Sequence, residues 1–246
     1  SSLCLKIELR VKKNMKDKVL ITGGEGLLGR NLLPKLKFNY YAPSQKDLDI
    51  TDICWKLDYN FIVHLAAYTD VANAEHEKTK CYTTNVIGTK NIVENSTCPI
   101  IYISTDYIFD GEDGNYPEYA TPNPINYYAF TKFCGELLVH NDNNLIIRTS
   151  FKPSKWEYPA AFTDLYTSAD YVDVISDEIA LCLNNFEYVN NRVNILHIAT
   201  ERKSIYELAS RRNEVNKLSI NDVPVELPKD VSLDCTLWKN IKKDIG

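Results

Sequence analysis

Residues 19–33 read VLITGGEGLLGRNLL, a short apolar run followed by a glycine-rich turn and a leucine-rich stretch. Four of the chain's nine glycines fall within residues 23–29, directly after a predicted strand and at the start of a predicted helix. In this context Gly23 permits a tight turn, Gly26 lets the backbone approach a pyrophosphate, and Gly29 lets the helix pack close to the strand. The backbone N–H groups and the positive end of the helix would then hold the phosphates of a dinucleotide. The predicted dinucleotide contacts in this loop are Gly23, Gly26, Leu27, Leu28 and Gly29.

Short apolar runs alternate with amphipathic stretches as the chain continues from this loop. The predicted strands cover residues 19–22, 39–42, 61–67, 99–105, 144–149 and 194–199. The clearest predicted helices cover residues 74–96 and 127–139. This alternation predicts an α/β fold, a Rossmann-type doubly wound parallel sheet with helices on both faces.

The alternation weakens after residue 150, where prolines interrupt the pattern. We therefore expect a dinucleotide-binding Rossmann domain over residues 15–150 and a smaller substrate-binding lobe over residues 151–246, interleaved with the last sheet elements. The only methionine, Met15, follows a stretch that lacks the apolar core and cleavage site of a signal peptide. We interpret residues 1–14 as an upstream extension or a remnant of expression.

The composition is that of an ordinary globular protein, with 44% hydrophobic residues, 25% charged residues and a net charge of −5. Lysines and arginines are scattered rather than clustered, so neither a nucleic acid nor an anionic membrane is the expected partner. The seven cysteines form an odd number without CxxC spacing, so neither a disulfide framework nor a zinc site is expected. We predict a cytoplasmic protein without a bound metal and leave open a homodimer.

The segment after the second predicted strand bears on the choice of dinucleotide. A carboxylate at the end of that strand would pair with the ribose 2′-OH of NAD. Ser44, Gln45 and Lys46 stand there instead. Because a hydroxyl and a cation tolerate a 2′-phosphate, NADPH is the predicted cofactor, with NADH as the alternative. Asp49, beside Ile50, either accepts a hydrogen bond from the adenine amino group or caps the following helix.

Two side chains at helical spacing are candidates for proton transfer. Tyr128 and Lys132 lie four residues apart, on one face of a predicted helix. A free tyrosine has a pKa of about 10, and a neighbouring ammonium is expected to lower it. The same lysine can hold the nicotinamide ribose. Ser104 and Thr105 end a predicted strand at the sheet edge where α/β folds bind ligands, so a hydroxyl there would hydrogen-bond a substrate carbonyl. His64, inside another predicted strand, is interpreted as a core histidine rather than a general base.

Longer motifs extend this pattern along the chain. They are ITGGEGLLG, LDITD, FIVHLAAYTDVANAE, NVIGTKNIV, ISTDYIFDG, YYAFTK and IIRTS, with LPKDVSLDCTLWKNI near the end. Together they cover residues 18–243 and resemble the extended short-chain dehydrogenase/reductases. Within that group the resemblance is closest to the dTDP-4-dehydrorhamnose reductase family, which are nucleotide-sugar 4-keto reductases.

The resemblance implies a catalytic set of Thr105, Tyr128 and Lys132. Hydride would pass from the nicotinamide to C4 of a 4-keto-6-deoxy sugar of the rhamnose type, and Tyr128 would supply the proton. The further dinucleotide contacts that it implies are Leu65, Ala66, Ala67, Tyr68 and Asn85, the last of which supports the lysine side. The substrate contacts are Thr69, Val71, Ser104, Thr105, Phe151 and Trp156.

Departures from the family pattern leave alternatives open. Phe151 stands where the family usually has a tryptophan, and the region that should bind the sugar nucleotide is shorter than usual. The identity of the sugar and of the base therefore stays open. One alternative is a combined 3,5-epimerase/4-reductase or another sugar-nucleotide epimerase, whereas Asp106 and Tyr107 after Thr105 disfavour a dehydratase. The other alternative is a regulatory subunit that binds the dinucleotide without turnover.

Overall fold

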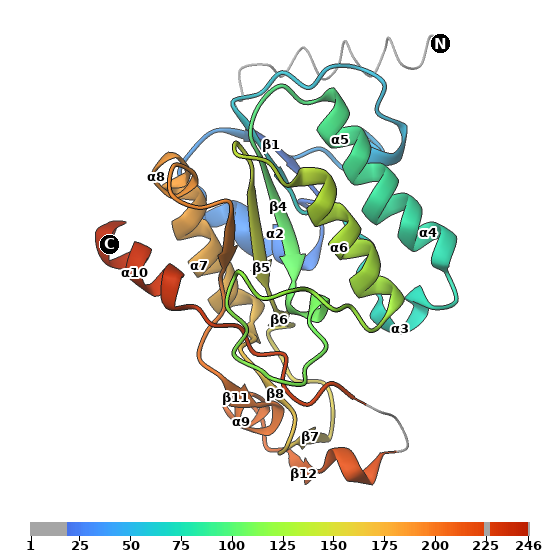
Figure 1. Cartoon of the computed structure of the whole chain (residues 1–246), viewed down its shortest axis with the longest axis vertical. Helices are drawn as coiled ribbons and strands as arrows, with labels where there is room; N and C mark the ends of the chain where they lie inside the picture. Colours follow the sequence, from blue (N-terminus) through green and yellow to red (C-terminus); the bar gives the residue numbers. More distant parts are fainter. Residues whose placement is uncertain (1–18, 224–226, 246) are drawn as a thin grey trace.

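A six-stranded parallel sheet forms the centre of the molecule (Figure 1). The computed structural model describes residues 19–223 and 227–245, and the predicted extension at residues 1–14 lies outside the described residues. The sheet order is β10-β5-β4-β3-β1-β2, so the direction of winding reverses at β1. The strands are β1 (Val19–Thr22), β2 (Tyr40–Tyr41), β3 (Phe61–His64), β4 (Ile100–Thr105), β5 (Leu145–Thr149) and β10 (Ile195–His197).

Each central strand buries both of its faces, which is why the strands read as continuous apolar runs. On β1, Val19 and Ile21 join one hydrophobic cluster while Leu20 joins the other. On β4, Ile101 belongs to the first cluster and Tyr102 to the second. The two clusters lie on opposite faces of the sheet, so the predicted doubly wound arrangement is confirmed.

Helices cover both faces of the sheet (Figure 1). One cluster is closed by α2 (Leu27–Leu32), α7 (Val172–Asn184), α8 (Phe186–Asn190) and α10 (Thr236–Ile245). The other face carries α5 (Thr89–Asn95) and α6 (Tyr127–Val139), with α3 (Val71–Ala74) and α4 (Lys78–Tyr82) packed against α6. Short 3₁₀ turns are η1 (Leu33–Lys35), η2 (Ile50–Asp52), η4 (Asp106–Ile108) and η5 (Ile220–Asp222).

The predicted helix over residues 74–96 contains a wider turn that the sequence pattern did not predict. Between α4 and α5 the π-helical turn η3 (Thr83–Gly88) continues the helix without a break. Gly88 is needed there, because a Cβ at this position would come within 2.6 Å of the Ile50 side chain. The turn carries Asn85, whose side chain is buried.

A small lobe lies beyond the carboxyl ends of β4 and β5 (Figure 1). It contains three two-stranded pairings and the helix α9 (Ile205–Ser210). The pairings are β6 (Phe151–Lys152) with β9 (Asp170–Tyr171), β7 (Ala160–Phe162) with β12 (Asn216–Leu218), and β8 (Tyr166–Thr167) with β11 (Lys203–Ser204). Between these segments the chain returns to the main sheet through α7, α8 and β10. The lobe is therefore built from separate stretches of sequence.

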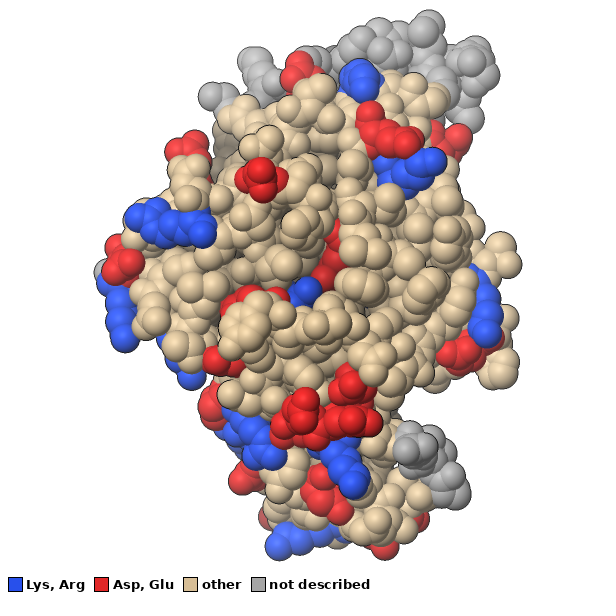
Figure 2. Space-filling view, viewed as in Figure 1, with Lys and Arg blue, Asp and Glu red and all other residues tan. Residues whose placement is uncertain are grey.

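Acidic and basic side chains are interspersed over the small lobe on the face shown in Figure 2. Exposed ion pairs of this region include Arg211 with Glu201 and Arg212 with Asp173 at the start of α7. The six cysteines within the described residues form no disulfide. No helix in the described ranges is long and apolar enough to cross a membrane.

Candidate active site

The glycine-rich loop has the geometry that its sequence predicts. Gly23 has φ of +72°, and a Cβ there would come within 2.5 Å of the Ala66 nitrogen, so both conformation and space require glycine. A Cβ at Gly29 would collide with the backbone of Gly24, which shows how closely α2 packs on the turn. Gly26 differs, because its backbone is extended and a Cβ would meet only the Gly23 oxygen, at 3.2 Å.

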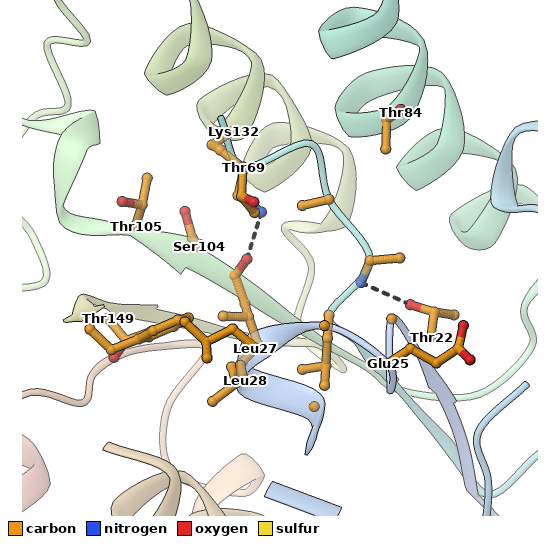
Figure 3. Close-up of a pocket in the computed structure, with 18 of the residues that line it drawn as sticks. Thr22, Glu25, Leu27, Leu28, Thr69, Thr84, Ser104, Thr105, Lys132 and Thr149 are labelled. Atoms are coloured by element: carbon orange, nitrogen blue, oxygen red, sulfur yellow. Dashed lines mark hydrogen bonds between the residues drawn. The ribbon is translucent and has the colours of Figure 1, made fainter. Parts of the chain in front are cut away.

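A cavity of about 740 Å³ opens between this loop and the carboxyl ends of β1, β3, β4 and β5. Figure 3 shows Ser104, Thr105 and Lys132 on one side of it and Leu27 and Leu28 on the other. It lies where the sheet reverses its winding, the usual ligand position in such folds. Most of the predicted site residues line it, namely Gly23, Gly26, Leu27, Leu28, Gly29, Asp49, Ile50, Leu65, Ala66, Ala67, Thr69, Val71, Ser104, Thr105, Tyr128, Lys132, Phe151 and Trp156.

The loop after β2 lies partly outside the lining of the cavity. Ser44 does not line the cavity, and its hydroxyl donates to Asp47 at 2.8 Å. Lys46 is exposed and also lies outside the lining, while Gln45 between them does line the cavity. The sequence pattern overlooked Asp47, which sits three residues after Ser44 in the same turn. Asp49 caps η2 by accepting from the Thr51 nitrogen at 2.9 Å and also faces the cavity.

Tyr68 and Asn85 stand behind the cavity wall rather than in it. The Tyr68 hydroxyl turns away and donates to Glu77 at 2.6 Å. The Asn85 side chain accepts from the Tyr68 nitrogen at 2.7 Å and donates to Thr131 at 3.0 Å. Asn85 thus ties the segment after β3 to α6, and the contacts of these two residues with the dinucleotide stay a prediction.

Tyr128 lies in the first turn of α6 and is buried at the cavity wall. Asn126 begins this helix by accepting from the Ala129 nitrogen at 2.8 Å, which fixes where the tyrosine sits. The Thr105 hydroxyl is within hydrogen-bonding reach of the phenol. Burial, followed by the electrostatic effect of Tyr107 and Asp106, raises the pKa of Tyr128. The expected lowering by Lys132 is therefore not found, because desolvation dominates.

Lys132 occupies the same wall one helical turn further along. Its ammonium donates to the carbonyl oxygen of Ile103 at 2.7 Å, a bond drawn in Figure 3, and lies 4.2 Å from the centre of the Tyr102 ring. Burial lowers the pKa of Lys132 to about 7, against the opposing effect of Glu136. The ammonium is thus held at the edge of the cavity by backbone and ring contacts.

Three buried oxygens around the carboxyl ends of β4 and β5 have no hydrogen-bond partner in the described part of the chain. They are Ser104 Oγ, Thr149 Oγ1 and Asp106 Oδ2. Burial raises the pKa of Asp106 to about 6. Because buried polar groups are nearly always hydrogen-bonded, these atoms point to a polar ligand. Thr149 and Asp106 were not predicted as site residues. Thr149 ends one predicted strand, and Asp106 directly follows another.

His64 has the core role predicted for it. Its ring nitrogens hydrogen-bond to Thr22 at 2.7 Å and to Thr89 at 3.0 Å. Burial lowers the pKa of His64 to about 3, so it stays neutral. Across the described residues, no group of three or more His, Cys, Asp or Glu side chains is placed to hold a metal ion.

Comparisons with known proteins agree with this geometry. A family model described as RmlD substrate binding domain matches residues 16–184. The dTDP-4-dehydrorhamnose reductase of Aggregatibacter actinomycetemcomitans is 32% identical over 180 residues, which are 66% of this chain and 61% of that protein. The chain spans about three fifths of the length of the first curated relatives that it matches. Methionine adenosyltransferase 2 subunit beta of Bos taurus is 31% identical over 145 residues, 51% of this chain and 43% of that protein.

Solved structures share the fold over nearly the whole chain. A hypothetical dTDP-4-dehydrorhamnose reductase from Sulfolobus tokodaii has a TM-score of 0.75 at 30% identity, covering 91% of this chain and 94% of that one. The dTDP-4-dehydrorhamnose reductase from Bacillus anthracis, solved in complex with NADP, has a TM-score of 0.77 at 25% identity, covering 93% of this chain and 98% of that one.

Proposed function

The chain belongs to the family described as RmlD substrate binding domain, and we propose that it reduces the 4-keto group of a nucleotide-activated 4-keto-6-deoxy sugar with NADPH. The observation that carries the proposal is that Tyr128 and Thr105 meet at one wall of a cavity whose other wall is the glycine-rich loop. The reductase names of the relatives and the NADP complex of the Bacillus anthracis protein support it.

The residues of the cavity fit a dinucleotide. The Gly26 nitrogen closes the turn by donating to the Gly23 oxygen at 3.0 Å, and α2 starts directly behind it, so the N–H groups in the first turn of α2 would face a pyrophosphate. Lys132 would hold the nicotinamide ribose at the far end of the cavity. There Ser104 and Thr149 offer buried hydroxyls that lack a protein partner in the described ranges. A polar ring and a carbonyl would satisfy them.

The chemistry assigned to this chain is acid catalysis. When bound, NADPH supplies a hydride to the carbonyl carbon of the substrate. Tyr128 donates its phenolic proton to the oxygen that becomes the C4 hydroxyl. Burial raises the pKa of Tyr128, so the phenol carries the proton that it has to donate. Thr105, whose hydroxyl donates to Asp106 in this structure, would turn that donor to the same oxygen and so position the carbonyl against the phenol.

NADPH oxidation with a panel of dTDP-, UDP- and GDP-linked 4-keto-6-deoxy sugars tests the proposal. We expect consumption of NADPH with at least one member, with formation of an equal amount of reduced sugar. NADH run in parallel decides the cofactor, and we expect NADPH to bind at least as well. The absence of turnover with every member of the panel would overturn the proposal.

A second candidate function is that of a dinucleotide-binding subunit without turnover. The similarity to a protein named as the beta subunit of methionine adenosyltransferase 2 favours it. Calorimetry separates the two candidates, since a subunit of this kind binds NADPH but shows no binding of a nucleotide sugar. A reductase binds both, and a nucleotide sugar then occupies the space beside Tyr128.

A further inference from the structure

We propose that Lys152 binds the diphosphate of the nucleotide-sugar substrate and so sets where the sugar lies against Tyr128. The inference rests on the proposed function, because it concerns the substrate of that same site. Lys152 belongs to β6, the short strand that carries the chain from the main sheet into the small lobe. No motif in the sequence singles it out.

The position of Lys152 is defined by two adjoining cavities. A second cavity of about 200 Å³ lies between η4 and the small lobe. Five residues line both this cavity and the large one, so the two meet at these side chains. They are Val71, Asp106, Tyr107, Ser150 and Lys152. Among the described residues that line the second cavity, Lys152 is the one cation.

The two cavities differ in character, and this difference orients the substrate. The large cavity contains Tyr128 and the polar oxygens around it, which suits the reacting sugar. The second cavity is lined largely by apolar side chains, including Ile125, Leu165 and Ile205, which suits the flat face of a nucleobase. In a nucleotide sugar the diphosphate joins these two parts. It therefore has to pass the junction that Lys152 lines.

The charge of Lys152 is preserved at this junction. Tyr107 and Asp106 raise the pKa of Lys152, and they outweigh the opposing effect of burial. The main-chain pairing of Lys152 with Tyr171 fixes the root of the side chain. Burying phosphate oxygens without a counter-charge is costly, whereas a held ammonium forms charge-assisted hydrogen bonds with them. Asp106 lines the same two cavities, and its carboxylate favours a charged Lys152 between itself and the diphosphate.

The test uses Lys152→Met in the full chain, with Lys229→Met as the matched control. Lys229 belongs to the small lobe, is exposed and lines neither cavity. The probes are dTDP, UDP and GDP, each with the corresponding nucleoside, measured by calorimetry with NADPH present. We expect Lys152→Met to weaken binding of a nucleoside diphosphate by about ten- to a hundredfold and to leave nucleoside binding unchanged. Lys152→Arg should keep most of the affinity, and Lys229→Met should have little effect.

In kinetics Lys152→Met should raise KM for the nucleotide sugar more than it lowers kcat, with NADPH affinity retained. Equal diphosphate affinity in the parent and in Lys152→Met would overturn the assignment, as would a parent that binds none of the three diphosphates. Lys152→Gln replaces the methionine variant if that one fails to fold. The outcomes are separable from the proposed function, because a parent that binds a diphosphate through Lys152 but reduces no sugar refutes the reaction and not the anion site.

Discussion

The hydroxyl of Thr105 donates a hydrogen bond of 3.2 Å to Oδ1 of Asp106, its neighbour in the chain. The bond forms because β4 ends at Thr105 and η4 begins at once, with Thr105 capping the turn by accepting from the Tyr107 nitrogen at 3.2 Å. It brings a buried carboxyl next to the proposed proton donor. The charge of Asp106 is one of the causes that raise the pKa of Tyr128.

Asp106→Asn should therefore shift the pH dependence of reduction. Removing a negative charge near the phenol lowers the pKa of Tyr128, and the protonated phenol is the active form. The loss of kcat at alkaline pH should begin at lower pH in the variant than in the parent. A pH–rate profile of both proteins checks this. An alkaline limb that stays in place, or moves to higher pH, would refute the coupling between the two groups.

Two glycine substitutions should separate binding from folding. Gly26→Val places a side chain where the backbone conformation allows it, so we expect dinucleotide binding to be lost while the melting temperature changes little. Gly23→Val forces a β-branched residue into a positive φ and against the Ala66 backbone, and should destabilise the fold by at least about 1–2 kcal/mol. Thermal unfolding and NADPH titration measure both effects. Unchanged NADPH affinity in Gly26→Val would mean that the loop is only a turn.

Tyr128→Phe removes one hydroxyl and keeps the ring volume, so stability should change little. General acid catalysis contributes about 10²–10⁴-fold, and kcat should fall by a factor in that range. NADPH should bind with the parent's affinity, which titration of both proteins establishes. Near-parental turnover in this variant would show that another group delivers the proton.

Lys132→Met should weaken NADPH binding and lower kcat together, because it removes the proposed ribose contact. The same substitution should increase the free energy of unfolding at acidic pH. Burial lowers the pKa of Lys132 to about 7, so the folded state bears the cost of the buried charge at acidic pH. The variant should be more stable than the parent below about pH 7, and the difference should shrink as pH rises toward the usual lysine range. Urea unfolding at several pH values measures it.

The main features of the fold follow from local patterns in the sequence. The strand β1 and the start of α2 can be predicted from local sequence alone, because the apolar run, the spaced glycines and the start of the helix follow one another in the chain. The burial of both faces of β4 follows in the same way from its run of apolar residues. The carboxyl ends of such strands share one edge, so Ser104 and Thr105 could be placed in the cavity in advance.

Other features depend on contacts between distant segments. Tyr68 was assigned to the dinucleotide from its position after β3, yet its hydroxyl donates a hydrogen bond to Glu77. Lys132 was expected to lower the pKa of Tyr128, but spacing along a helix says nothing about burial, which decides the direction. Lys152 lies at the junction of two cavities that exist only once the small lobe is folded against η4.

The transfer of deuteride from NADPH that carries deuterium at both positions of the nicotinamide C4 tests the central claim most directly. The parent protein is incubated with a 4-keto-6-deoxy nucleotide sugar from the panel, and the product is analysed by mass spectrometry and NMR. We predict one deuterium in the product, attached to C4 of the sugar, in an amount equal to the NADPH consumed. A product labelled at another carbon, or NADPH that stays bound and unoxidised with every sugar, would contradict the account.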